Sequence, residues 1–231
     1  MAILNFFRSF KARLLRYLCP YNPLFLFKST RVLGFPLSYR RIQNADDFIL
    51  GISKRFPSSS GSLSLDLGCG KLPKNPFYAE RITGVDIIDS SDGNIIMANL
   101  VAHPIPFPDS VADYITAYDF IEHVPRSILS PEGDVRFPFI HLINEVSRVL
   151  KPGGIFFSWT PAFPSKECFT DPTHVNYITE NTFVDYFCSD DPLRRPKATI
   201  YGYTGTLCLV DQVWYKCWLL TVMVKKEHTS T

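Results

Sequence analysis

The sequence lacks a strong excess of charge, a long apolar run and any CxxC pair of cysteines. Its net charge is only +2 over 231 residues, which does not indicate a nucleic-acid-binding surface spread over the whole protein. No apolar run reaches the roughly 20 residues of a membrane-spanning helix. The six cysteines show no zinc spacing, which is typical of a reduced protein. We therefore expect a cytoplasmic protein with no nucleic-acid partner.

Acidic residues are absent from the first 45 residues, whereas lysine and arginine are frequent there. The apolar and basic positions of residues 1–20 predict a basic amphipathic helix. This helix either caps the following domain, contacts the inner membrane surface peripherally, or belongs to a cleaved targeting peptide. Prolines then predict a loop-rich connection over residues 19–38. We assign residues 1–40 to this helix and connection, and residues 41–231 to one domain.

The order of apolar runs and helical patterns predicts an α/β domain. Expected helices cover residues 42–55 and 138–150, and expected strands cover residues 62–67, 82–87, 94–98, 112–117 and 155–160. Glycines after position 150 are expected to stop the second helix. Two further apolar runs, residues 206–211 and 218–225, have no helix between them and predict an antiparallel pair at one sheet edge.

The most informative segment is LDLGCG at residues 65–70, followed by GVDI at residues 84–87. In both segments an acid closes or follows an apolar run, and Asp86 follows Asp66 by twenty positions. This spacing is typical of adjacent parallel strands whose ends hold a nucleoside-bearing cofactor. Glycine in the turn lets the backbone approach the ligand, and an acid at the second strand end can accept both ribose hydroxyls. The pattern alone leaves the identity of the cofactor open.

Five segments in order resemble the class I S-adenosylmethionine-dependent methyltransferases. Besides the two above, they are residues 99–109, residues 112–124 ending in EHV, and EVSRVLKPGG at residues 145–154. The resemblance implies a Rossmann-like seven-stranded mixed sheet with helices on both faces and an antiparallel C-terminal strand pair. A nicotinamide-dependent oxidoreductase is disfavoured, because its G-x-G-x-x-G fingerprint does not continue past Gly70.

Carried over by motif, the resemblance implies which residues would contact S-adenosylmethionine. The methionine moiety would be lined by Asp66, Gly68, Cys69 and Gly70, the ribose would be bound by Asp86, and the adenine would contact Ile87, Asn99 and Leu100. Ala117, Tyr118 and Asp119 would face the sulfonium. Pro73 and Pro76 predict that the helix after the glycine turn is short or delayed, which puts in question the usual helix-dipole geometry near the cofactor carboxylate. Lys71 either supplies charge there instead or is an ordinary solvated lysine.

Methyl transfer to a hydroxyl needs alignment of the acceptor and a base for its proton. Asp171 and His174 lie in a proline-tethered loop after the fifth strand, and we predict His174 as the base with Asp171 orienting it. His123 is the second candidate. A hydrogen bond of purely structural value is the alternative role for each residue. The histidines form no metal-ligand spacing, so no metal site is expected.

The segment DPTHVN at residues 171–176 resembles methyltransferases associated with bacterial surface-polysaccharide clusters. We therefore expect O-methylation of a saccharide or another polar hydroxyl acceptor. Transfer to a quinone, lipid or nitrogen acceptor is the first alternative, and a non-catalytic protein that binds S-adenosylmethionine is the second. The sequence indicates no particular oligomeric state.

Overall fold

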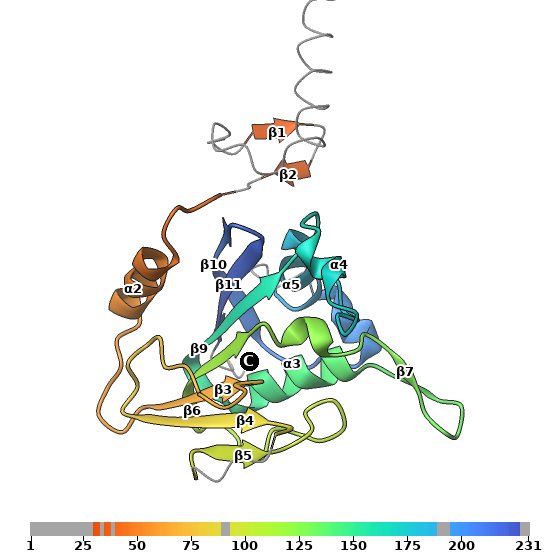
Figure 1. The fold of residues 1–231 in the computed structure, drawn as a ribbon, viewed down its shortest axis with the longest axis horizontal. Coiled ribbons are helices and arrows are strands. Elements are labelled where there is room, and N and C mark those ends of the chain that lie inside the picture. The colour runs from red at the N-terminus through yellow and green to blue at the C-terminus, as the bar shows by residue number, and fades with distance from the viewer. Residues whose placement is uncertain (1–29, 33–34, 38–39, 89–92, 189–194, 227–231) are drawn as a thin grey trace, which may run out of the picture. The chain divides into compact units, whose positions relative to one another are not determined.

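A computed structural model of the chain describes residues 30–32, 35–37, 40–88, 93–188 and 195–226 (Figure 1). The chain divides into two compact units, residues 1–41 and 42–231. In the first unit, β1 (Thr30–Val32) pairs antiparallel with β2 (Phe35–Leu37). Part of the expected loop-rich connection is therefore a hairpin, because short β-forming runs flank a glycine in the sequence. The helix predicted for residues 1–20 lies outside the described residues.

The second unit is built on a seven-stranded mixed sheet in the order β10-β11-β9-β6-β3-β4-β5. Its parallel strands are β3 (Leu63–Leu67), β4 (Arg81–Asp86), β5 (Ile95–Met97), β6 (Ala112–Tyr118) and β9 (Leu150–Pro161). The C-terminal strands β10 (Leu207–Tyr215) and β11 (Trp218–Lys225) are antiparallel to each other, and β11 is antiparallel to β9. The expected mixed sheet and its antiparallel pair are confirmed.

Helices cover both faces of this sheet, as expected (Figure 1). α2 (Ala45–Arg55) packs on one face in a cluster that includes Phe157 of β9. α3 (Pro138–Val149) and α5 (Glu180–Tyr186) pack on the other face in a cluster that includes Phe156. Adjacent residues of one strand thus face opposite layers, as the two-residue period of a strand requires.

The segment between α3 and β9 differs from the prediction. The helix ends at Val149, and β9 already begins at Leu150, whose backbone is extended and pairs with Ala112. Gly153 has a positive φ of 79°, but it lies inside β9, where the pairing with β6 is irregular. The glycines therefore accommodate an irregular strand start and do not form the helix stop.

No helix connects β3 to β4, and this whole connection belongs to the described residues. Residues 68–80 form turns, which goes further than the short or delayed helix that the prolines predicted. The connection packs tightly on β4. A Cβ placed on Gly84 would lie 2.4 Å from Cys69 Sγ and 2.7 Å from Pro73 Cγ, so only glycine lets the loop come this close.

Short elements complete the described part of the domain. They are η1 (Ile121–His123), β7 (Ile128–Leu129), β8 (Val135–Arg136), α4 (Glu167–Thr170) and η2 (Lys197–Tyr201). Arg148 of α3 holds the segment after β5 in place: it donates to the carbonyls of Ile105 and Phe107 and forms an ion pair with Asp109. Within the described part of the chain, none of the helices has the length and apolar character that crossing a membrane requires.

Candidate active site at the carboxyl ends of the strands

The glycine turn after β3 leaves open space beside its backbone. Gly68 and Gly70 both have positive φ, 67° and 62°. A Cβ on Gly68 would lie 2.3 Å from the ring of Phe120, whereas a Cβ on Gly70 would meet nothing within 4 Å. The backbone at Gly70 is therefore accessible to a ligand, which is the role that the sequence assigned to this turn.

Asp66 anchors this turn from inside the protein. Its Oδ1 accepts a hydrogen bond from Thr116 of β6 at 2.6 Å, and its Oδ2 accepts from the backbone N–H of Lys74 at 2.8 Å. Burial raises the pKa of Asp66 to about 6, although both hydrogen bonds favour the ionised form. Because Asp66 is buried at 1% exposure, a ligand cannot reach its oxygens, and Asp66 shapes the site by holding the loop.

Asp86 stands at the end of β4 with capacity for a ligand. Its Oδ2 accepts from the backbone N–H of Gly70 at 2.8 Å, and its Oδ1 accepts from that of Ile88 at 3.0 Å. Each carboxylate oxygen keeps a second lone pair. Ile87 and Met97 beside it are 65% and 63% exposed, so an uncovered apolar surface adjoins the acid.

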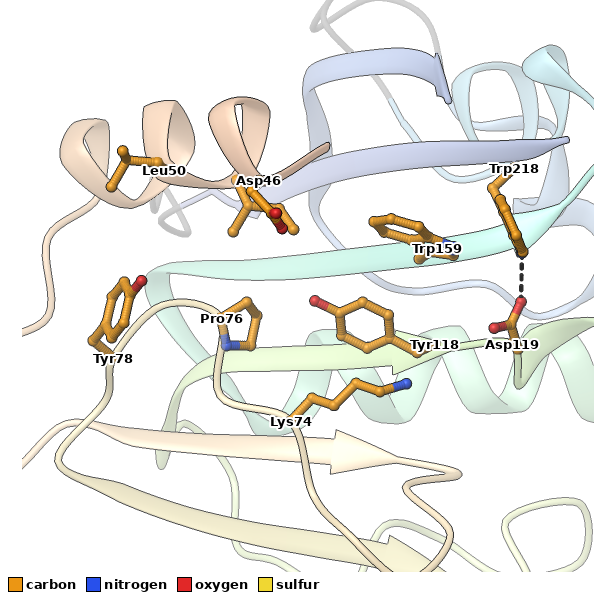
Figure 2. Close-up of a pocket in the computed structure, with 10 residues that line it drawn as sticks. Asp46, Leu50, Lys74, Pro76, Tyr78, Tyr118, Asp119, Trp159 and Trp218 are labelled. Atoms are coloured by element: carbon orange, nitrogen blue, oxygen red, sulfur yellow. Dashed lines mark hydrogen bonds between the residues drawn. The ribbon is translucent and has the colours of Figure 1, made fainter. Parts of the chain in front are cut away.

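A cavity of about 520 Å³ opens next to these strand ends, on the face that α2 covers (Figure 2). Its lining residues come from α2, the helix-free connection and the ends of β6, β9 and β11: Asp46, Ile49, Leu50, Lys74, Pro76, Tyr78, Tyr118, Asp119, Trp159 and Trp218. The ring centroid of Trp159 lies 5.7 Å from that of Tyr118 and 5.9 Å from that of Trp218. Aromatic rings thus form one wall.

Polar groups are placed among these rings. Trp218 donates its indole N–H to Asp119 Oδ1 at 2.8 Å, which fixes both side chains at one end of the cavity (Figure 2). The ammonium of Lys74 lies 4.3 Å from the centroid of the Tyr118 ring. Tyr118 and Asp119 were predicted to face the sulfonium, so the cavity adjoins the place where the methyl group is expected.

The three predicted catalytic residues lie close together on the same rim. The rings of His123 and His174 have centroids 4.8 Å apart. Asp171 Oδ2 lies 4.0 Å from His174 Nε2, which is an electrostatic contact and too long for a hydrogen bond. Instead, Asp171 Oδ1 accepts a hydrogen bond from the hydroxyl of Thr173 at 2.6 Å. The same Thr173 Oγ1 lies 3.0 Å from His123 Nδ1. His174 Nδ1 lies 3.3 Å from the carbonyl oxygen of Cys168.

Glu122 is buried beside the two histidines. Its Oε2 accepts from the hydroxyl of Thr160 at 2.7 Å, while its Oε1 is buried with no hydrogen-bond partner. Burial raises the pKa of Glu122 to about 7. One ligand atom each from Glu122, His123 and His174 lie within 4.8 Å of one another, so this group could hold a metal ion. Spacing along the sequence gave no sign of it, because the fold brings His174 from another loop.

Residues 65–158 match the family model described as a methyltransferase domain. This range includes the glycine turn, the ends of β3, β4 and β6 and most of β9, and it stops one residue before Trp159. Residues 65–158 thus carry a methyltransferase domain, and the sheet around them has the expected class I, S-adenosylmethionine-dependent methyltransferase fold. A comparison with curated proteins gives no match.

The chain is similar to several solved structures. The putative methyltransferase in complex with the Trm112 activator from Haloferax volcanii is 15% identical with a TM-score of 0.50, covering 79% of this chain and 90% of that chain. The N-methyltransferase NodS from Bradyrhizobium japonicum is 14% identical with a TM-score of 0.49, covering 79% and 94%. A putative type 11 methyltransferase from Sulfolobus solfataricus is 15% identical with a TM-score of 0.48, covering 82% and 96%.

The methyl donor of this methyltransferase is S-adenosylmethionine, and the strand ends fit it. The open backbone at Gly70, the spare lone pairs of Asp86 and the exposed Ile87 suit an amino-acid end, a ribose and an adenine in that order. Asn99 is exposed next to them, whereas Leu100 and Ala117 are buried in the core at 4% and 0% exposure. The side chains of these last two residues therefore shape the site from beneath.

The sequence analysis missed most of the cavity of this methyltransferase. Trp159, Trp218 and Lys74 line it, yet none of them stands in a recognised motif. Trp159 could have been found, because a side chain two positions after the buried Phe157 in a strand points to the same face near the strand end. Lys71, the lysine singled out from the sequence, is exposed and does not line the cavity.

We predict that Asp86→Ala weakens the binding of S-adenosylhomocysteine by about 10²–10⁴-fold, since two charge-assisted hydrogen bonds of about 1.5–3 kcal/mol each are lost. Isothermal titration calorimetry measures this directly. Asp47→Ala, an exposed acid on α2, is the control and should bind as the wild type does. An unchanged affinity for Asp86→Ala would show that the ribose lies elsewhere.

Proposed function

We propose that this methyltransferase transfers a methyl group to a hydroxyl of a saccharide or another polar acceptor, by in-line displacement with His174 as the base. The observation that carries the proposal is the pairing of an aromatic-walled cavity with a histidine and aspartate cluster at one edge of the sheet. A hydroxyl acceptor needs both features, because it must be held in line with the sulfonium and must lose its proton.

The cavity supports a ring-shaped polar acceptor. Flat aromatic side chains such as Trp159 offer apolar contact to the faces of a sugar ring, while charged groups such as Asp119 and Asp46 accept hydrogen bonds from hydroxyls. The resemblance of residues 171–176 to enzymes of surface-polysaccharide clusters points to the same class of acceptor.

The environment of His174 supports its role as base. Two hydrogen bonds from Thr173 lower the pKa of Asp171, so this carboxylate stays ionised beside the imidazole. A carboxylate held 4.0 Å from Nε2 stabilises the imidazolium that forms when the proton is taken up. In the reaction the acceptor oxygen bonds to the methyl carbon, the sulfur–carbon bond breaks with its electron pair moving to sulfur, and the hydroxyl proton passes to the imidazole.

We predict that His174→Ala lowers the methylation rate by about 10²–10⁴-fold, the usual contribution of a positioned base. Transfer of tritiated methyl from S-adenosylmethionine to a panel of methyl glycosides measures the rate. Calorimetry with S-adenosylhomocysteine should show unchanged donor affinity, which separates loss of the base from loss of the fold.

His141→Ala is the matched control, because His141 is exposed on α3 away from the cluster. It should retain the full rate. A His174→Ala enzyme as fast as the control would return His174 to a structural role and leave His123, which Thr173 links to Asp171, as the candidate base.

The unpartnered oxygen of Glu122 favours a second form of this proposal, in which the cluster binds a metal ion. Two imidazoles, each with Nδ1 near a protein oxygen, and one carboxylate make a three-residue set that suits Zn²⁺ with an open position. In this form Glu122, His123 and His174 would hold the ion, and the ion would supply Lewis acidity that makes a nearby hydroxyl easier to deprotonate.

For the second form we predict one bound Zn²⁺ per chain, measured by competition with a chromophoric chelator. Glu122→Gln should weaken binding by at least 10-fold, since even disturbing the partner of a ligand costs about 10–100-fold. Glu132→Gln, in an exposed loop, should bind as the wild type does. Mg²⁺ should compete poorly, because it prefers oxygen ligands. Equal Zn²⁺ affinity in both variants would exclude this form.

We also propose a cytoplasmic location with peripheral contact to the inner membrane surface through residues 1–20. The support is the basic, acid-free sequence of this segment. Deletion of residues 1–20 should abolish co-sedimentation with anionic liposomes while S-adenosylhomocysteine still binds. A full-length protein that does not sediment with the liposomes would contradict the contact.

A further inference from the structure

The helix-free connection between β3 and β4 leaves the carboxylate of the methyl donor without a helix N-terminus to bind it. In sheets of this type, the N-terminus of the helix after the first strand supplies partial positive charge to an anionic group. Residues 68–80 are all described and contain no helix, so this chain has no helix dipole at that place. The amino-acid end of S-adenosylmethionine nevertheless carries a carboxylate.

Lys74 brings a full positive charge to the same place. Its backbone N–H is fixed on Asp66 Oδ2, and its ammonium lies 4.3 Å from the ring centroid of Tyr118. Figure 2 shows the side chain running below Tyr118 toward Asp119. Lys74 is the one cation among the residues that line the cavity.

The ammonium of Lys74 also has capacity for an anion. Among the described residues, no carboxylate lies within ion-pair distance of it. Asp46 and Asp119 also line the cavity, so an anionic group entering it would meet negative charge unless Lys74 offset it. Lys71, the other lysine of the connection, does not line the cavity.

We infer that Lys74 binds the carboxylate of the donor's methionine moiety, in place of the missing helix N-terminus. The inference rests on S-adenosylmethionine as the donor and is independent of the acceptor and of the base. Lys74 would therefore discriminate between nucleosides that carry the complete amino-acid end of the donor and nucleosides that lack it.

Two nucleosides separate this role from a general effect on the fold. S-adenosylhomocysteine carries the carboxylate, whereas 5′-methylthioadenosine has the same adenosine and thioether without the amino-acid end. Calorimetry with both ligands should show that Lys74→Met weakens S-adenosylhomocysteine by about 10- to 100-fold, the usual range for a lost charge-assisted hydrogen bond, and leaves 5′-methylthioadenosine unchanged.

Lys71→Met is the matched control and should bind both nucleosides as the wild type does, while Lys74→Arg should retain most of the affinity for S-adenosylhomocysteine. An equal loss of both nucleosides in Lys74→Met would overturn the inference, because it would mean that the loop had shifted. Unchanged binding of S-adenosylhomocysteine would overturn it as well. Since no acceptor and no turnover enter the measurement, failure of the proposed O-methylation would leave its outcome intact.

Discussion

The site depends on the two hydrogen bonds that the buried carboxylate of Asp66 accepts. A long connection without a helix has no internal hydrogen-bond ladder, so its position must be fixed from outside. Asp66 does this by binding Thr116 of β6 with one oxygen and the N–H of Lys74 with the other. Gly70 is then held against Asp86, and the loop packs on Gly84. Groups from three strands and one loop, among them those proposed to bind the donor, thereby keep a single arrangement.

Loss of the helix also changes what the sheet can bind. A helix after β3 would normally cover part of the face on which α2 packs. Here a proline-containing loop takes its place, and a cavity of about 520 Å³ remains between that loop, α2 and the sheet. The rings of Tyr118 and Trp159 project into this space, where a covering helix would have buried them. The same change therefore removes a dipole from the donor site and makes room beside it.

The strands and the glycine turn were predictable because each depends on local sequence: an apolar run, an acid and a glycine within a few residues. The cavity was not, because Trp218 and Asp119 meet from positions 99 residues apart. His123 and His174 were both placed in segments that follow the carboxyl ends of strands, on one rim of the sheet, and the structure brings their rings together there. The pairing of Asp171 with Thr173 instead of His174 reflects a local Asx turn, which the residue types Asp and Thr two apart could have indicated.

The end of β9 connects the two halves of the proposed acceptor site. Trp159 faces the α2 side and lines the cavity, while the next residue, Thr160, binds Glu122 beside the histidines. Because adjacent strand residues point to opposite faces, an acceptor stacked on Trp159 must extend over the strand end to reach His174. The sulfonium expected at Tyr118 lies on that path. The proposed acceptor site would suit a rigid ring, because a fixed spacing between stacking face and hydroxyl would secure the roughly 7–11 kcal/mol that alignment can contribute.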